Sequence, residues 1–185
     1  ASFNPLEIRQ AHVRVANSRF ENNAIGGLGG NRNGRAQIAP GTISVRGAQP
    51  VIVNNDFINN DGPVITIDVN AMKSFVVTDW GRSTGAVSAF DAYSNNVGPL
   101  VRENRMTNNQ INGMEVRGAT LTTEVVWDDT DIVHVLRGEI IVPNYHHYGG
   151  IRLQSSDTQS LVVKLQGDDA GFSAMGRPME VDDRI

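Results

Sequence analysis

Three aspartates in one short segment are the residues of this sequence whose types and spacing best suit chemistry. Asp128, Asp129 and Asp131 stand together, and two arginines, Arg137 and Arg152, follow them. Carboxylate clusters bind calcium through their oxygen atoms, so this segment is a candidate metal site. Aspartate pairs also form turns through their side chains, and adjacent residues of an extended chain face opposite sides. We therefore expect turn-forming residues here, with a calcium site as the alternative.

A second group of candidate residues carries rings. Tyr145, His146, His147 and Tyr148 are consecutive and precede two glycines, while Trp80 stands in an irregular stretch. Such rings can stack on a sugar, and imidazoles can bind a metal, although adjacent side chains on an extended chain point apart. These five residues are the predicted ligand-binding set, with packing as the alternative. The chain has no recognisable catalytic motif, so we predict no catalytic residue.

The elements that would position these residues show an internal repeat. Residues 6–23 align without a gap on residues 43–60, at an offset of 37. A third copy is split, with its tail at 106–109 and its head at 114–119. Short segments that alternate apolar and polar residues, or are apolar throughout, are typical of strands. They occur at 64–69, 74–78, 132–136, 139–142, 151–153 and 161–165.

Many short strands suit a sandwich, a barrel or a solenoid, but only stacked coils require equivalent positions to repeat. The strands expected at 43–45 and 64–67 are about 22 residues apart, which is enough for three short strands and their turns. Ile8 and Val45 should then occupy equivalent inward positions. The sequence thus predicts an all-β parallel β-helix that forms a single domain over 1–185, with loop excursions at 24–41 and 79–96.

Asparagine is the residue that such coils would use at their corners, and the chain contains 18 of them. It tolerates the left-handed backbone conformation, and stacked side-chain amides at about 4.8 Å can hydrogen-bond as a ladder. We expect two columns, one of Asn22, Asn59 and Asn108 and one of Asn23, Asn60 and Asn109, with Asn22 and Asn59 largely buried at coil turns. The glycines that follow the repeated arginine are expected to need a positive φ, namely Gly47, Gly118 and Gly138. A lone strand histidine, His134, is expected at the surface or hydrogen-bonded.

The N-S-x-F-x-N-N pattern of residues 17–23 resembles the right-handed parallel β-helix repeats of the pectin-lyase-like superfamily. Residues 127–185 are similar to segments of very large bacterial secreted or surface proteins. The resemblance implies a right-handed coil and an extracellular or cell-surface location in bacteria. Lyases of this kind use carboxylate clusters beside an arginine or lysine base, which would give the acidic segment a catalytic role.

Composition excludes several classes of function. The formal net charge is −4 with a pI near 5.5, so broad electrostatic attraction to nucleic acid is not expected. No apolar run is long enough to span a membrane. The absence of cysteine excludes disulfides and thiolate metal sites.

The function expected from these features is structural. We predict a non-catalytic, structural or adhesive extracellular module of a large bacterial surface or matrix protein, with polysaccharides or other surface proteins as partners. One alternative is a polysaccharide-binding or lyase-type β-helix. Another is a self-assembling filament segment, because open strand edges at the ends of a β-helix invite pairing. Since Leu6 already belongs to an expected strand, we also expect a fragment of a longer solenoid.

Overall fold

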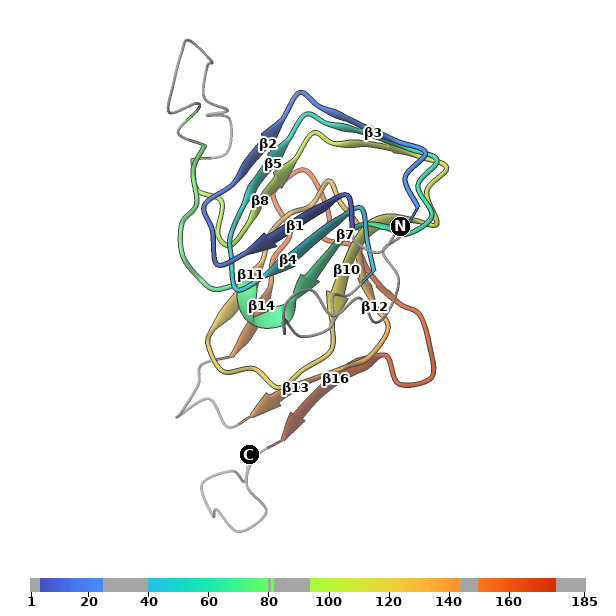
Figure 1. The fold of residues 1–185 in the computed structure, drawn as a ribbon. Helices are drawn as coiled ribbons and strands as arrows, with labels where there is room; N and C mark the ends of the chain where they lie inside the picture. Colours follow the sequence, from blue (N-terminus) through green and yellow to red (C-terminus); the bar gives the residue numbers. More distant parts are fainter. Residues whose placement is uncertain (1–3, 25–39, 80, 82–93, 144–149, 176–185) are drawn as a thin grey trace, which may run out of the picture.

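The chain folds into an all-β structure whose strands pair in parallel, as the sequence predicts (Figure 1). The computed structural model describes residues 4–24, 40–79, 81, 94–143 and 150–175. These residues form sixteen strands and one 3-10 helix, η1 (Val69–Ala71). None of the helical structure in these ranges is long and apolar enough to cross a membrane.

Within the described ranges the strands belong to five sheets. Sheet A contains β1 (Leu6–Arg9), β4 (Ile43–Arg46), β7 (Pro63–Asp68), β10 (Ile111–Arg117), β12 (His134–Leu136) and β15 (Val163–Leu165). Sheet B contains β2 (Arg14–Ala16), β5 (Val51–Val53) and β8 (Leu100–Arg102), and sheet C contains β3 (Arg19–Glu21), β6 (Asp56–Ile58) and β9 (Arg105–Thr107). The two remaining pairs are β11 (Val125–Trp127) with β14 (Ile151–Leu153) and β13 (Glu139–Pro143) with β16 (Gly171–Met175).

The first nine strands form three stacked structural repeats, each made of one strand from sheets A, B and C. Repeat 1 comprises β1–β3, repeat 2 comprises β4–β6 and repeat 3 comprises β7–β9. Figure 1 shows the three paths lying one upon another, from blue through cyan to yellow-green. Between repeats 1 and 2 the partners are 37 residues apart, as in Leu6 with Ile43 and Phe20 with Phe57. The offset derived from the sequence is therefore the register of the sheets.

Between repeats 2 and 3 the offset is shorter in sheet A. It is longer in sheet C, because the third copy of the sequence repeat is split. Ile43 pairs with Ile65, which is the expected offset of 22 residues. A long connection then separates β7 from β8, so Phe57 meets Met106 in sheet C. The head of the split copy returns to sheet A, where β10 pairs with β7. The chain thus accommodates insertions between strands without losing the parallel alignment.

The core consists of apolar side chains that stack in columns on the inner face of sheet A. Ile8 pairs with Val45, and both are almost completely buried, which confirms their equivalent inward positions. The same column continues through Ile67, Val116 and Leu136. Because side chains alternate between the two faces of a strand, one residue in two from each strand enters the core.

Two local expectations are wrong. Residues 74–78 alternate like a strand, but Lys73 and Val76 make only isolated antiparallel bridges. Of the three repeated glycines, Gly47 has the expected positive φ of 58°, whereas Gly118 and Gly138 do not. Gly118 is required for another reason, because a Cβ there would lie 2.5 Å from the Glu139 carbonyl oxygen.

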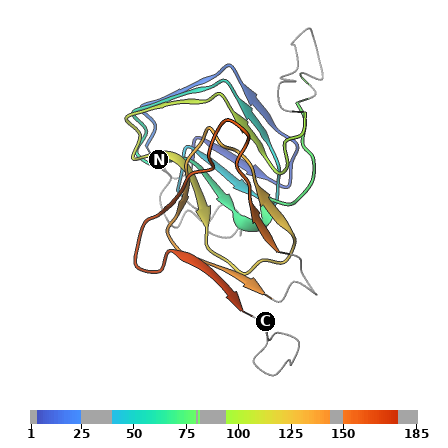
Figure 2. The ribbon, with the colours of Figure 1, turned by 180° about the vertical axis from the view of Figure 1, so that it is seen from behind.

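The C-terminal part of the described chain follows a different path. Figures 1 and 2 show β13 and β16 at the end of the molecule that lies away from β2 and β3. Sheets B and C end at β8 and β9 within the described residues, while sheet A continues through β15. Most of both predicted excursions, 24–41 and 79–96, lies outside the described residues.

Candidate functional site

The acidic segment lies beneath β8, where sheet B ends in the described part of the chain. Its three carboxylates each accept a hydrogen bond from a different backbone N–H group in or beside this strand. The contacts are Val97 N to Asp128 Oδ2 (2.9 Å), Val101 N to Asp129 Oδ1 (3.2 Å) and Glu103 N to Asp131 Oδ2 (2.6 Å). The aspartates therefore bind donors of the kind that a further strand of sheet B would have bound.

A buried arginine from β8 offsets part of this negative charge. Arg102 is 5% exposed, and its Nη2 donates to the Asp128 carbonyl oxygen at 2.6 Å while its Nη1 donates to Thr130 Oγ1 at 3.1 Å. Its Nε lies 3.4 Å from Asp129 Oδ1, and its Nη1 lies 3.6 Å from Asp131 Oδ1. Burial raises the pKa of Asp129 well above the usual value, against the opposing effect of Arg102. Most polar atoms of this cluster thus have partners within the fold, while Asp128 Oδ1 is buried without a hydrogen bond to the described residues.

These contacts favour the turn-forming role over a metal site. In the described ranges, no three His, Cys, Asp or Glu side chains are grouped so that they could hold a metal ion. Asp129 is only 1% exposed, so its oxygens are not presented to solvent. Of the two arginines considered with this segment, Arg152 has its Nη2 3.7 Å from Glu124 Oε1. Calcium binding by Asp128, Asp129 and Asp131 stays a prediction that the geometry does not support.

Trp80, Tyr145, His146, His147 and Tyr148 all lie outside the described residues. Their role in binding a sugar stays a prediction.

One predicted asparagine column is an internal ladder. Asn23 Nδ2 donates to Asn60 Oδ1 at 2.8 Å, and Asn60 Nδ2 donates to Asn109 Oδ1 at 2.7 Å. Asn109 Nδ2 continues the series to Asn112 Oδ1 at 2.8 Å, a member that the sequence did not suggest. Asn60 and Asn109 are buried, so the ladder satisfies polar groups inside the corner.

The other column has a different role. Asn22, Asn59 and Asn108 have φ values of 55°, 53° and 59°, and all three side chains are exposed. The expectation that Asn22 and Asn59 are buried is therefore wrong. The left-handed backbone turns the chain at this corner, which sends the side chain outward and the next asparagine inward. Asn108 Nδ2 still donates to Asn59 Oδ1 at 3.0 Å on the surface.

A second internal ladder was not predicted from the sequence. Ser18 N donates to Asn55 Oδ1 at 3.0 Å, and Asn55 Nδ2 donates to Asn104 Oδ1 at 2.9 Å. Asn54 before it has the same left-handed φ, 53°, as Asn59 before Asn60. The signal was the Asn-Asn pair itself, which occurs at both corners of repeat 2.

A histidine and a tryptophan form the centre of the C-terminal half. His134 pairs with Met114 in sheet A and is 0% exposed, so it belongs to the core and not to the surface. Its ring stacks on Trp127, with centroids 5.0 Å apart and planes 13° apart. Burial lowers the pKa of His134 to about 4. An imidazole held neutral in this way is a core residue and has no access to a substrate.

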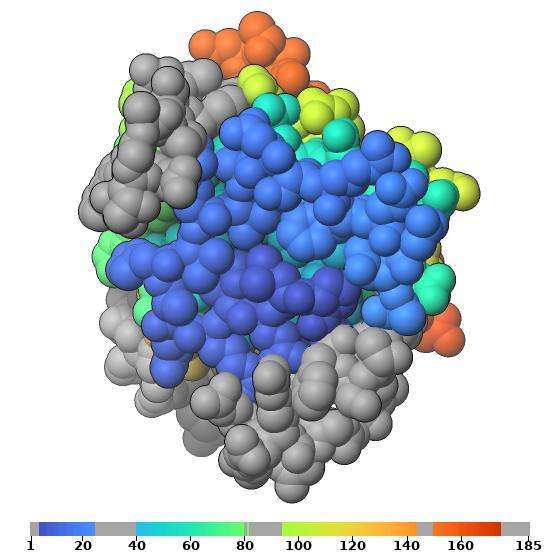
Figure 3. All heavy atoms as spheres, turned by 45° about the horizontal axis from the view of Figure 1, so that its top comes forward, coloured from blue at the N-terminus to red at the C-terminus, as the bar shows by residue number. Residues whose placement is uncertain are grey.

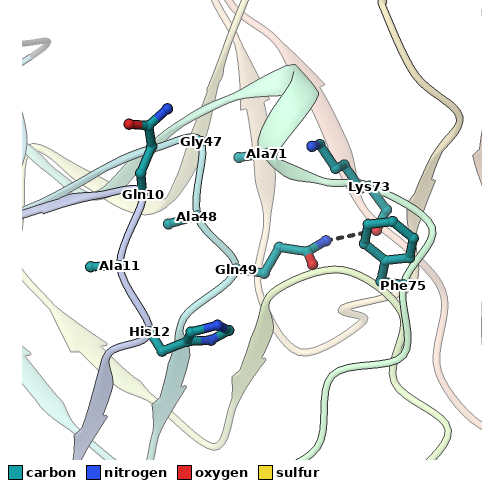
Figure 4. Close-up of a pocket in the computed structure, with 9 residues that line it drawn as sticks. All are labelled: Gln10, Ala11, His12, Gly47, Ala48, Gln49, Ala71, Lys73 and Phe75. Carbon is teal, nitrogen blue, oxygen red and sulfur yellow. Dashed lines mark hydrogen bonds between the residues drawn. The ribbon is translucent and has the colours of Figure 1, made fainter.

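A pocket at the corner between sheets A and B is an open site formed by described residues (Figure 4). Its volume is about 280 Å³, and it is lined by the same corner of three consecutive repeats. Gln10 and His12 come from repeat 1, Gln49 from repeat 2, and Lys73 and Phe75 from the segment after η1. Gln49 Nε2 donates to the Lys73 carbonyl oxygen at 2.8 Å, which leaves the Lys73 ammonium group separate from this bond.

The chemistry of this pocket suits binding more than catalysis. Phe75 is 63% exposed, as is its neighbour Val76, so two adjacent apolar side chains face solvent here. An aromatic face beside amide and ammonium donors can hold a polar ligand that has an apolar side. Comparison with known proteins adds no assignment, because no protein-family model, curated protein or solved structure matches the chain.

Proposed function

We propose that this chain is a segment of a right-handed parallel β-helix of the pectin-lyase-like kind. In this proposal it serves as a non-catalytic, structural or adhesive module of a large bacterial surface or matrix protein. The stacked registers support the solenoid, since sheet A strands pair in parallel across successive repeats. A stack of this type gives an elongated and regular scaffold.

The observation that carries the structural role is the use made of the acidic segment. In a lyase of this fold, carboxylates and a base must face one groove that is open to an acidic sugar. Here Asp129 is buried, and Asp128, Asp129 and Asp131 cap separate backbone N–H groups. The residue types of a lyase are present, and the arrangement uses them to close a sheet edge.

The test is a lyase assay on pectate and alginate, with and without millimolar calcium. We expect no release of unsaturated oligosaccharide, followed by ultraviolet absorbance. The informative variant is Asp131→Asn, because this residue is exposed and the substitution keeps its size. Product formation that this variant abolishes, at an unchanged unfolding temperature, would contradict the structural role and favour a lyase.

A second candidate function, polysaccharide binding, is favoured by the corner pocket. The exposed Phe75 ring would stack on the apolar face of a sugar, while Gln10 and the Lys73 ammonium group would bind its hydroxyl or carboxylate groups. On a glycan array, Phe75→Ala should lower binding about tenfold or more. Val76→Ala is the matched control, because this residue is equally exposed and does not line the pocket. Equal binding by both variants would contradict this site.

A further inference from the structure

The N-terminal end face of the described molecule has three strand edges that no described strand pairs with. We define it as the outer edges of β1, β2 and β3 with the side chains of Leu6, Phe20 and Asn23. Each of these strands is the outermost member of its sheet in the described ranges, so its backbone is paired on one side only. Figure 3 looks toward this end, where the atoms of repeat 1 (blue) form the front of the molecule. Unpaired strand edges are templates for another strand.

The side chains of this face match those of an internal face. Phe20 stacks on Phe57 with ring centroids 5.1 Å apart, and Leu6 pairs with Ile43. Phe57 and Ile43 are both 0% exposed because repeat 1 covers them, whereas Leu6 and Phe20 are partly exposed. Repeat 1 therefore presents the same apolar pattern outward that repeat 2 presents to repeat 1.

The asparagine ladder also has a direction, and its first acceptor has no donor among the described residues. Each member donates from its backbone N and its Nδ2 to the Oδ1 of the following asparagine, as Asn60 does to Asn109 at 3.0 and 2.7 Å. Asn23 donates in the same way to Asn60. No donor in the described residues reaches Asn23 Oδ1. An asparagine placed above Asn23 would complete the series.

Charge on the outer surface points to the same partner. Arg19, Asp56 and Arg105 form one column of sheet C, with alternating sign. Arg105 Nε lies 2.5 Å from Asp56 Oδ1. A partner with a carboxylate above Arg19 would continue this alternation, and repeat 2 itself has that residue at the equivalent position.

From these four features we propose that the N-terminal end face is a docking surface for one further three-strand parallel repeat of the repeat 2 type. The partner carries apolar residues over Leu6 and Phe20 and an asparagine over Asn23. The inference rests on the proposed solenoid function and extends it, because it specifies what this end binds. Continuity with the interface between repeats 1 and 2 defines the chemistry of the occupant.

The opposite end of a second copy fits this face poorly. In the described residues, sheets B and C stop at β8 and β9, so the C-terminal end offers no strands to β2 and β3. Only β15 of sheet A would meet an equivalent strand. A separate repeat with all three strands is therefore the better partner.

The experiment supplies that repeat in the same chain. A duplicate of residues 41–62 replaces residues 1–3 and is joined directly to Asn4. This places the duplicated Ile43 22 residues before Leu6, the offset that separates Ile43 from Ile65. The matched control carries Val45→Asp and Ile52→Asp in the duplicate alone, because both positions are fully buried in repeat 2.

Docking should raise the midpoint of thermal unfolding by about 5 °C relative to the parent chain and the control. It should also slow amide hydrogen exchange about tenfold at Glu7, Arg19 and Glu21, which point to the open edge because neighbours in these strands alternate. Equal behaviour of duplicate and control would overturn the proposal. Slow exchange of these amides in the parent would also overturn it, with sedimentation showing whether a second copy already covers the face. Polysaccharide cleavage would overturn the proposed function alone.

Discussion

The corners of repeats 1–3 and the acidic segment beneath β8 bury polar groups by different means. In repeats 1–3 the buried groups at the corners are neutral amides, and each ladder passes the same bonds from one repeat to the next, as from Asn23 to Asn60. Beneath β8 the ladders give way to charges, with Arg102 and Asp129 in the interior. Regular stacking lets one residue type solve the same problem repeatedly, whereas the end of a sheet needs a particular solution.

The difference has a consequence for stability. An amide ladder loses only a few bonds when one member is removed, because its neighbours stay bonded to backbone as well. A buried ion pair that loses one partner leaves a charge without compensation. We therefore expect the charged cluster beneath β8 to be more sensitive to substitution and to pH than the asparagine ladders.

The largest effect is expected for Arg102→Ala. This removes the cation and two hydrogen bonds from a buried cluster, so the free energy of unfolding should fall by about 3–5 kcal/mol in urea titrations. Arg105→Ala is the matched control, because its ion pair with Asp56 lies at the surface, and its effect should be much smaller. Equal effects of the two variants would show that the buried cluster beneath β8 is no more sensitive to substitution than a surface ion pair.

The second-largest effect is expected on the stability of the folded chain at acidic pH. His134 has a pKa of about 4 in the folded chain, against 6.5 as its ordinary value. Between these values the unfolded chain binds a proton that the folded chain does not, so stability is lost as pH falls through this range. The full loss would be up to about 3 kcal/mol. The free energy of unfolding of His134→Met should therefore fall less than that of the parent when the pH is lowered from about 7 to about 4.5.

Asp129 should affect the pH dependence of stability in the opposite direction, so it provides a control for His134. Burial raises its pKa, so the folded chain keeps a proton that the unfolded chain has released. This contribution to stability is present at low pH and is lost as pH rises through the raised pKa. Asp129→Asn should thus make the parent's acid sensitivity steeper, whereas His134→Met makes it shallower. The same direction for both variants would contradict one of the two assignments.

The third effect tests the ladders. Asn60→Ala removes the amide that bonds Asn23, Asn109 and a backbone carbonyl, so we expect a loss of about 1–3 kcal/mol in unfolding free energy. Asn59→Gly is the control, because that residue is exposed and glycine adopts its φ of 53° freely. A larger effect at Asn59 than at Asn60 would contradict the internal ladder.

The sequence predicted most of the fold because its signal was periodic. The offset of 37 residues became the register of three sheets, and the pairing of Asn23 with Asn60 followed from it. A one-residue shift would have moved every inward side chain to the outer face, so the repeat fixes register strongly. The handedness came from the resemblance and the extent from the expected strand at Leu6, and the solenoid with both of these features stays a proposal.

The candidate site was less predictable, because its contacts join segments with no common period. Nothing in the sequence around Asp129 indicates that it accepts a bond from Val101 N, 28 residues earlier. His134 was placed outside the core because a histidine alone is usually solvated, yet its register with Met114 places it inside. The pocket beside Phe75 depends on three corners that meet only in the folded chain.

The smallest effect is expected at an arginine-glycine motif that occurs in both halves. An arginine precedes Gly47 in repeat 2 and Gly138 in the C-terminal half, but only Gly47 has a positive φ, 58°. Gly47→Ala must hold a Cβ in the left-handed region, which costs about 1–2 kcal/mol. A Cβ at Gly138 would lie 3.7 Å from its nearest neighbour, an ordinary contact, and alanine restricts the unfolded chain. Gly138→Ala should therefore change the free energy of unfolding by no more than about 0.5 kcal/mol. Thermal and urea unfolding of both variants would measure the difference, and a loss at Gly138 equal to that at Gly47 would mean that the two corners share one backbone conformation.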